Sequence, residues 1–335
     1  MRARFGSTLS TMLTRFLSGT DRHGREHIVM KTIFRTIMNF VFPSIFILVL
    51  MMSAPPTRAA DGAPGTIYSR IISLYSAHTE NLVSLGAAEQ LVGISTSDDY
   101  PPQILDKPRF SYREDPEKFI AAQPDLVLVR PMIERSYPQL LDKLRQAGIE
   151  VVSLQPVSIA GIFDYWRVLG QLTGRSEAAE DMIASFQDEL AAITARVKNV
   201  PPEKRPRVYF ESIHKKMKTF APQSIAIFVL EQAGGVNVAA DAPRVRQTNI
   251  AEYGKERILA KADEIDVFIA QQGRMNPVSR EAIRNEPGFL AIRAVREGRV
   301  FIVAEQLVSR PTLRILEGVR QLHGYLYQEQ YKMPI

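Results

Sequence analysis

Apolar residues recur at helical spacing along one long stretch near the middle of the chain, Ser176–Lys198. Ser176 is a favourable N-cap, Glu177 brings negative charge to the first turn, and Pro201-Pro202 ends the pattern. The stretch therefore predicts a single helix, roughly 34 Å long. Its apolar face is formed by Ala179, Met182, Ile183, Phe186, Leu190, Ile193 and Val197.

Short apolar runs alternate with helical segments before this helix, over residues 66–157. Such alternation is typical of a parallel α/β sheet. The predicted strands are Arg70–Tyr75, Leu91–Ser95, Asp125–Arg130 and Ile149–Leu154, with a short extended piece at Arg109–Tyr112. The predicted helices are Thr79–Leu85, Glu117–Gln123 and Tyr137–Gln146.

The same order recurs after the long helix, over residues 205–330. The predicted strands are Arg207–Glu211, Val236–Ala239, Asp266–Ala270 and Arg299–Val303, and the predicted helices are Ser224–Gln232, Glu256–Ala262, Gly288–Val295 and Thr312–Tyr327. Two segments of each half also align weakly, including those that carry Glu117 and Glu256. We therefore expect an α/β fold of two Rossmann-like lobes with parallel sheets, bridged by a helical region at 158–204 that contains the helix 176–198.

The first 59 residues differ from the rest in charge and hydropathy. They carry eight Lys or Arg and two acidic residues, so they account for the whole formal charge of +6 and give no support to nucleic-acid binding. From Met30, a short basic segment precedes an apolar run and the small residues around Ala59. This is the pattern of a secretory signal peptide, with Met30 as the expected start and a retained membrane anchor as the alternative.

The chain contains no cysteine. Disulfides, thiolate metal sites, a cysteine nucleophile and a lipidated N-terminal cysteine are thereby excluded for this sequence. An exported protein that is not a lipoprotein needs an outer membrane to retain it, so we expect a periplasmic location.

Several segments, in their order and spacing, resemble one family of transport proteins. They are YSAHTENL with LGAAEQLVGIS, the block from Glu117 to PDLVLV, EQAGGVNVAAD, and AVREGRVFIV followed by SRPTLRILEGVRQL. The chain resembles the iron-complex (siderophore and haem) and cobalamin class of periplasmic substrate-binding proteins of ABC importers. The resemblance implies two lobes joined by one rigid helix, ligand held in the cleft between them, and an ABC permease and ATPase in the inner membrane as partners. It also implies a monomer with little hinge motion.

Ligands of open parallel sheets bind beyond the carboxyl ends of the strands. Arg is suited to anionic oxygens and Tyr offers an aromatic face with a polar tip, so an anionic ferric chelate fits best, with a corrinoid as the first alternative and no resident cofactor expected. The candidate ligand-binding residues in the corresponding loops are Tyr75, His78, Tyr100, Tyr112, Arg113, Arg130, His214, Lys215, Arg246, Arg274 and Arg310.

Other ligands and an enzymatic role stay open at this point. His78 and His214, with a carboxylate such as Asp98 or Glu305, could bind a bare transition-metal ion, or one histidine could ligate haem iron. The single tryptophan, Trp166, lies in a helical run and favours core packing over ligand stacking. A periplasmic metal-handling enzyme would use the same two histidines, but the sequence holds no catalytic motif such as G-x-S-x-G or H-E-x-x-H.

Glu117 and Glu256 open helices in corresponding places of the two lobes. A carboxylate there is favourable in its own right, because it faces the positive end of the helix dipole. The resemblance implies a further role, in which one acidic residue of each lobe docks against basic residues of the permease.

Overall fold

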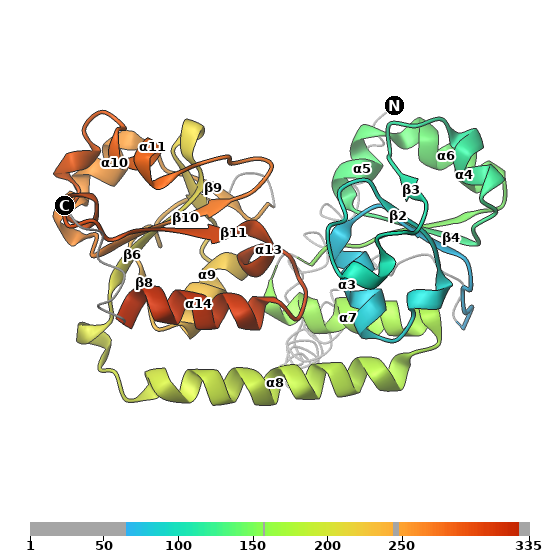
Figure 1. The fold of residues 1–335 in the computed structure, drawn as a ribbon, viewed down its shortest axis with the longest axis horizontal. Coiled ribbons are helices and arrows are strands. Elements are labelled where there is room, and N and C mark those ends of the chain that lie inside the picture. Colours follow the sequence, from blue (N-terminus) through green and yellow to red (C-terminus); the bar gives the residue numbers. More distant parts are fainter. Residues whose placement is uncertain (1–64, 157, 244–247, 328–335) are drawn as a thin grey trace, which may run out of the picture. The chain divides into compact units, whose positions relative to one another are not determined.

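The computed structural model describes residues 65–327, except residue 157 and residues 244–247, and Figure 1 shows its fold. These residues belong to one compact unit, Ala60–Ile335, and the predicted leader lies outside them. Within the described part, none of the helices has both the length and the apolarity needed to cross a bilayer.

The first sheet is parallel throughout, as the sequence predicts, and has the strand order β3-β2-β1-β4-β5. Its strands are β1 (Ile71–Ser73), β2 (Leu91–Ser95), β3 (Arg109–Phe110), β4 (Leu126–Val129) and β5 (Glu150–Ser153). The strand order reverses between β1 and β4, which makes that place the topological switch point of the sheet. We call this sheet and helices α3–α6 the first lobe.

The second sheet has the order β11-β10-β6-β7-β9, with β8 paired to the beginning of β6. The strands are β6 (Arg207–Ile213), β7 (Lys218–Phe220), β8 (Val236–Asn237), β9 (Ile250–Glu252), β10 (Val267–Gln272) and β11 (Val300–Ala304). The prediction of a parallel sheet is wrong for β7, which runs antiparallel to β6 and β9. Neither β7 nor β9 was predicted, because each is only three residues long and lies beside polar or turn residues. This sheet and helices α9–α14 form the second lobe.

The helices mostly follow the predicted segments, with shifted ends. They are α3 (Ser76–Ser84), α4 (Pro116–Ala121), α5 (Pro131–Ser136), α6 (Pro138–Gln146), α7 (Ile159–Thr173), α8 (Ser176–Lys198), α9 (Ile225–Gln232), α10 (Lys255–Ala260), α11 (Arg280–Arg284), α12 (Arg293–Arg296), α13 (Glu305–Val308) and α14 (Ile315–Tyr327). The single helix predicted over Gly288–Val295 is wrong: Gly288 has φ +87° and Ile292 is extended, so a 3₁₀ turn and α12 replace it. The start predicted for the last helix, Thr312, is three residues too early.

The two lobes share one construction, which the weak sequence repeat had suggested. In the first lobe, the Asp125 carboxylate accepts a hydrogen bond from the backbone N–H of Arg70, at 2.9 Å, where β1 begins. In the second lobe, the Asp266 carboxylate does the same for Arg207 at the start of β6, at 2.8 Å. Strands β1, β4 and β5 therefore correspond to β6, β10 and β11, and the switch point of the second lobe lies between β6 and β10.

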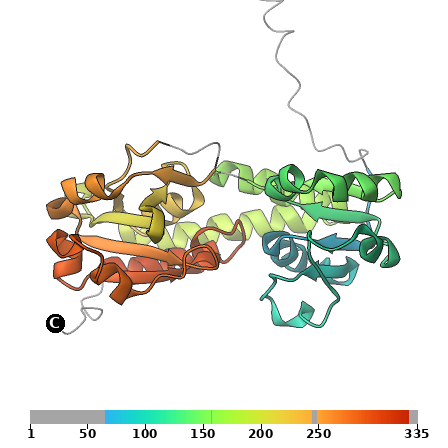
Figure 2. The same cartoon turned by 90° about the horizontal axis from the view of Figure 1, so that it is seen from above.

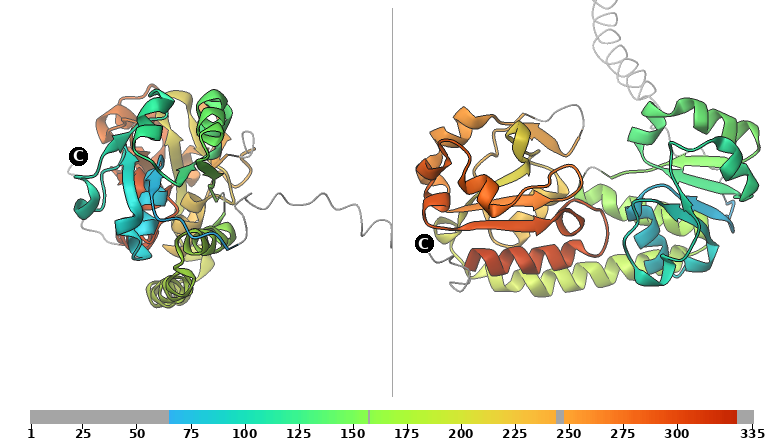
Figure 3. Two further views of the ribbon diagram at one scale, coloured as in Figure 1. Left: turned by 90° about the vertical axis from the view of Figure 1, so that its right-hand side faces the viewer. Right: turned by 45° about the horizontal axis from the view of Figure 1, so that its top comes forward.

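The long helix α8 spans Ser176–Lys198, with the bounds that the apolar stripe predicts. The proposed capping role of Ser176 is wrong, because Ser176 is the first helical residue and Arg175 holds the cap position without a side-chain hydrogen bond. The cause is the short turn from α7: Gly174 has φ +68°, and the backbone N–H of Arg175 bonds the carbonyl of Gly170 at 2.7 Å. Figures 1 and 2 show α7 and α8 side by side, and α14 lies along α8 in Figures 1 and 3.

One hydrophobic cluster runs through both lobes along α8. Alternate residues of each strand point to opposite faces of a sheet, and one face of each sheet joins this cluster. Ile71 of β1 and Val208 of β6 belong to it, together with Trp166 of α7 and Phe186 of α8. The opposite faces pack into two separate clusters, one under α4 to α6 and one under α10 to α12.

The contact between α7 and α8 predicts opposite effects for two glycines of α7. A Cβ on Gly170 would lie 2.8 Å from the Cβ of Ala179 and 2.9 Å from the Arg175 carbonyl oxygen, whereas a Cβ on Gly161 meets nothing closer than 3.5 Å. Gly170→Ala should therefore lower the free energy of unfolding by about 1–2 kcal/mol through overpacking. Gly161→Ala should leave it unchanged or raise it by up to about 1 kcal/mol, since alanine favours the helix. Urea unfolding measures both, and an equal effect of the two substitutions would contradict this packing.

Candidate functional site

The switch point of the first lobe carries a tyrosine and an arginine in contact. Tyr75 follows β1 and Arg130 follows β4, and the guanidinium carbon of Arg130 lies 5.2 Å from the ring centroid of Tyr75. Burial raises the pKa of Tyr75 to about 12, although the charges of Arg130 and Arg310 act to lower it. The phenol therefore stays protonated and can donate a hydrogen bond to a ligand.

The guanidinium of Arg130 has hydrogen-bond donors that no protein acceptor uses among the described residues. Within the described residues, its side chain has no carboxylate or carbonyl partner, and stacking on Tyr75 leaves the edge of the guanidinium open. A guanidinium held by an aromatic ring is well suited to bidentate binding of a carboxylate or another anionic oxygen pair.

The first lobe also has a pocket of about 560 Å³, which lies between the loop after β3 and the start of α6. Tyr112 and Tyr137 face one another in it with ring centroids 4.8 Å apart, and the guanidinium of Arg113 lies 5.6 Å from the Tyr112 ring. The pocket thus combines two aromatic faces with a cation, which suits a ligand with planar or apolar parts and negative charge.

His78, a candidate ligand residue, lies in the core of the first lobe. The residue is fully buried in α3, and its Nε2 donates to the carbonyl oxygen of Val129 at 3.0 Å. Its Nδ1 then accepts from the hydroxyl of Tyr165 at 2.7 Å. Burial lowers the pKa of His78 to about 4, so the imidazole is neutral and both nitrogens are occupied. We remove His78 from the proposed ligand set.

His214 is tied to the second lobe by carboxylates. Its Nδ1 lies 3.0 Å from a carboxylate oxygen of Glu211, which is fully buried, and its Nε2 lies 3.7 Å from Glu286. Lys255 in turn pairs with Glu286 at 2.6 Å. The hydrogen bond that His214 Nδ1–H donates to the Glu211 carboxylate raises the pKa of His214 above its ordinary value. The shared metal site considered for His78 and His214 is not formed, since the partners of each imidazole lie on its own side of the molecule.

The switch point of the second lobe presents cations on short turns. Arg274 is exposed on the turn after β10, and Asn276 fixes that turn by donating to the Gln271 carbonyl at 2.7 Å and accepting from the backbone N–H of His214 at 2.9 Å. Lys215, just after β6, is also exposed. Among the residues that the structure describes, neither Lys215 nor Arg274 has an acidic partner.

One carboxylate lies at the same edge of the second sheet. Glu305 follows β11, and its side chain packs on Gly273, where any Cβ would overlap the carboxylate. Within the described residues, the carboxylate of Glu305 has no hydrogen-bond partner, so it is free to accept from a ligand amide or hydroxyl. The edge therefore offers more positive than negative charge.

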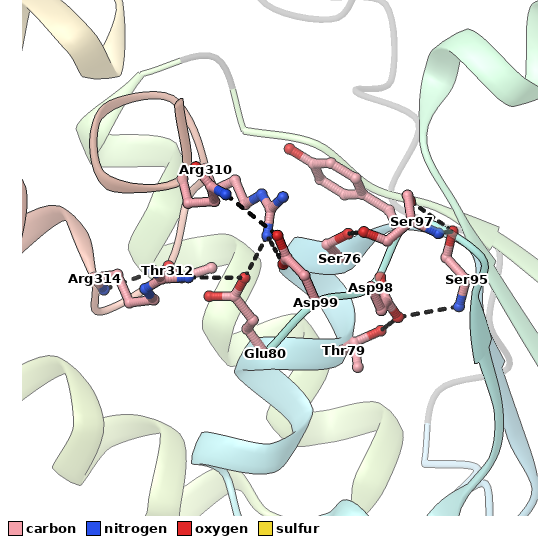
Figure 4. A network of polar contacts seen from close by, with 12 residues as sticks. Ser76, Thr79, Glu80, Ser95, Ser97, Asp98, Asp99, Arg310, Thr312 and Arg314 are labelled. Atoms are coloured by element: carbon pink, nitrogen blue, oxygen red, sulfur yellow. Dashed lines mark hydrogen bonds and ion pairs between the residues drawn. The ribbon is translucent and has the colours of Figure 1, made fainter. Parts of the chain in front are cut away.

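Arg310, another candidate ligand residue, joins the two lobes instead (Figure 4). Its Nη1 bonds Glu80 at 2.8 Å and Asp99 at 3.0 Å, both in the first lobe. Burial raises the pKa of Glu80 despite this cation, whereas at the more exposed Asp99 the bond and charge of Arg310 outweigh burial and lower the pKa. Tyr100 lies nearby, with the guanidinium of Arg314 4.5 Å from its ring centroid.

Glu117 and Glu256 occupy the same position in helices of equal length. Each is the second residue of a six-residue helix, α4 or α10, and each is exposed. The connection from α10 to β10 is longer than that from α4 to β4, and a 3₁₀ turn at Ala262–Glu264 takes up the difference. In the described part of the chain, neither carboxylate forms an ion pair.

The structure thus brings together only part of the predicted site. Tyr75 and Arg130 meet at one switch point, Lys215 and Arg274 lie at the other, and Tyr112 and Arg113 line the pocket of the first lobe. Arg246 lies outside the described residues. The prediction missed Tyr137, Glu80 and Arg314, because their partners are distant in sequence and no local pattern marks them.

These features agree with comparisons to known proteins. Residues 71–307 match the family of periplasmic binding proteins. The vitamin B12-binding protein of Vibrio cholerae is 27% identical over 259 residues, which cover 77% of this chain and 88% of that protein. An uncharacterized ABC transporter substrate-binding lipoprotein of Bacillus subtilis is 26% identical over 266 residues, which cover 78% of this chain and 81% of that protein. A solved structure described as a possible iron-binding (periplasmic solute-binding) protein from Staphylococcus epidermidis matches with a TM-score of 0.68 at 30% identity, covering 78% of this chain and 99% of that one.

Two α/β lobes on one long helix, with ligand-type side chains at both switch points, define a bilobal solute-binding protein. The chain belongs to the periplasmic binding protein family. Its relatives are solute-binding proteins of the cobalamin and iron-complex class, and an ABC permease and ATPase is the partner that they imply. The resemblance seen in the sequence is therefore confirmed, and relatives of this kind act outside the cytoplasm.

The two buried histidines predict a stability maximum near pH 6.5. The folded pKa of His78 is lowered from 6.5 to about 4, so its contribution is present above pH 6.5 and is lost as the pH falls towards 4. The folded pKa of His214 is raised, so its contribution is present below about pH 6.5 and is lost as the pH rises through the folded value. His78→Gln should remove the part of the decline on the acid side that this imidazole causes and keep the decline on the alkaline side, because an amide side chain does not titrate. Thermal unfolding from pH 4 to 9 tests this, and an unchanged acid decline in the variant would contradict it.

Proposed function

We propose that the protein is a periplasmic receptor that captures an anionic iron chelate of the ferric siderophore type and delivers it to an ABC importer. The observation that supports this most directly is the pair of cationic switch points. Arg130, stacked on Tyr75, belongs to one sheet, and Lys215 and Arg274 belong to the other. Without an acidic partner among the described residues, these cations are available to a ligand that carries several negative oxygens.

Two further observations favour a bulky chelate. The pocket of the first lobe offers the rings of Tyr112 and Tyr137 with Arg113 beside them. The carboxylate of Glu305 can accept from amide or hydroxyl groups at the ligand periphery. A ligand that reaches all of these groups has to be larger than a bare ion.

Cobalamin or another corrinoid is the second candidate. A relative named as a vitamin B12-binding protein aligns over 77% of the chain. Tyr75, Tyr112 and Tyr137 could then supply aromatic contacts, whereas the only tryptophan, Trp166, is fully buried.

A bare metal ion and an enzymatic role find less support. The two histidines that either function would use are bonded within their own lobes. Among the described residues, no group of three or more His, Asp or Glu side chains is placed to hold a metal ion. We therefore propose stoichiometric binding without turnover, by a protein that is held in the periplasm and carries no lipid.

Arg130 should contribute directly to ligand affinity. Arg130→Met should weaken binding of the ferric chelate about ten- to a hundredfold, since a charge-assisted bond contributes about 1.5–3 kcal/mol. Arg135→Met is the matched control, because Arg135 lies on the next helix and is exposed. Equal affinities for the two variants would argue against Arg130 as a ligand residue.

The spectrum and mass of the ligand bound to protein isolated from the periplasm identify the chelate. A bound corrinoid would overturn the siderophore proposal.

Glu117 and Glu256 should act on transport and not on ligand binding. Glu117→Ala with Glu256→Ala should abolish uptake in cells and leave the dissociation constant unchanged, because both carboxylates are exposed and neither belongs to the proposed ligand-binding residues. Glu134→Ala with Glu281→Ala provides the control, since these exposed carboxylates also lie in first helical turns. Normal uptake with the first pair altered would refute a docking role.

A further inference from the structure

The loop between α13 and α14 connects the second lobe to the first, and we call this contact the interlobe joint. It is distinct from α8, through which the chain itself passes from one lobe to the other. Its members on the side of the first lobe are Glu80, Asn81, Asp99 and Trp166, and its members from the second lobe are Gln306, Arg310, Pro311 and Arg314.

The neutral half of the joint is buried. The carbonyl oxygen of Pro311 accepts from the side-chain amide of Asn81 at 2.9 Å and from the indole N–H of Trp166 at 3.3 Å. Asn81 and Trp166 are both fully buried. A loop that satisfies two buried donors cannot move away without leaving them unpaired, which is costly.

The ionic half of the joint lies around Arg310. Its side chain is 12% exposed, and the carboxyl group of Glu80 beside it is 3% exposed. Asp99 is bonded on its other oxygen by Gln306 at 3.2 Å, and Arg314 lies 3.9 Å from Glu80. The guanidinium of Arg310 is thus engaged with two carboxylates of the opposite lobe before any ligand arrives.

The joint lies directly beside the proposed ligand site. Asp99 comes shortly after β2 of the first sheet and Gln306 comes shortly after β11 of the second, and their side chains form a hydrogen bond of 3.2 Å. Ser76, the neighbour of Tyr75, donates to the carbonyl oxygen of Ser97 in the same loop as Asp99. The carboxyl edges of the two sheets therefore meet at the joint. A contact in this position determines how far apart the two switch points lie.

We propose that Arg310 is a positioning residue, which fixes the separation of the two switch points and thereby selects ligands by size. Two lobes joined only by one helix can rotate relative to one another. A second contact between them, at another place, prevents that rotation. The first connection is α8, which contains no Gly or Pro and packs along both lobes. The role of the joint in selectivity rests on the proposed function, whereas its mechanical role does not.

Distance measurements between the lobes test the mechanical role. The chain has no native cysteine, so Gln146→Cys and Arg284→Cys place one spin label on each lobe at exposed residues. Glu80→Gln with Arg310→Met removes the ionic half without leaving a buried charge unpaired, and the distance distribution should broaden. If that variant does not fold, Asp99→Asn, at a half-exposed carboxylate, should broaden it to a smaller degree.

The ion pair Glu189–Arg320 supplies a matched control, because it connects α8 with α14 at a distance from the joint. Glu189→Gln with Arg320→Met should leave the distribution as narrow as in the unmodified chain. Trp166 gives a second readout, since the only tryptophan donates to Pro311 and its emission should shift in the joint variant alone. A distribution as narrow in the joint variant as in the control would overturn the proposal.

Ligand selectivity tests the second part of the proposal. The probes are a ferric trihydroxamate, a ferric tricatecholate, haemin and cyanocobalamin, which differ in size. The joint variant should reduce the ratio between the strongest and the weakest affinity about tenfold or more, and an equal loss for every probe would refute a role in selection. If the unmodified protein binds none of them, the proposed function fails, while the distance measurement still decides the mechanical role.

Discussion

The apolar stripe of α8 is the constraint on which the rest of the molecule depends. A 23-residue helix with a polar outer face is not stable by itself in water, so its stripe has to be covered. Helices α7 and α14 cover it from the two lobes, and the inner faces of both sheets pack behind them. Folding of either lobe is thereby linked to the helix that separates them, and the switch points are held at the ends of a common framework.

The sequence predicted those features that depend on local pattern. The stripe of α8 is periodic over its whole length, and β2 and β4 are short, almost continuous apolar runs, so their positions followed directly. The short strands β7 and β9 have no such pattern: β7 pairs with β6, and β9 pairs in turn with β7, so both depend on contacts distant in sequence. Similarly, Ser176 was expected to cap α8, but the turn at Gly174 begins the helix one residue earlier than that role requires.

In the candidate site, too, features that depend on local pattern were predicted and features that depend on distant contacts were not. Tyr75 and Arg130 could be placed because each is the last residue of a predicted strand, and parallel strands end at one edge of a sheet. Their stacking could not be foreseen, nor could the core position of His78, which is set by Tyr165, a residue 87 positions further along the chain. Arg310 is the clearest case: its loop suggested a ligand residue, while its partners Glu80 and Asp99 lie more than 200 positions away. The residue type correctly indicated that this arginine binds anionic oxygens, but these belong to Glu80 and Asp99 and not to a ligand.

The two faces of each sheet pack into different clusters, and this affects how the ligand preference of such proteins can change. In each sheet, one face belongs to the cluster shared along α8, and the other belongs to a cluster confined to its own lobe. The pocket-lining loops and the helices that carry Glu117 and Glu256 lie over the confined clusters. Substitutions there can accumulate in one lobe without disturbing the common framework. New ligand preferences can therefore arise in one half of the molecule while the other half keeps its ancestral form.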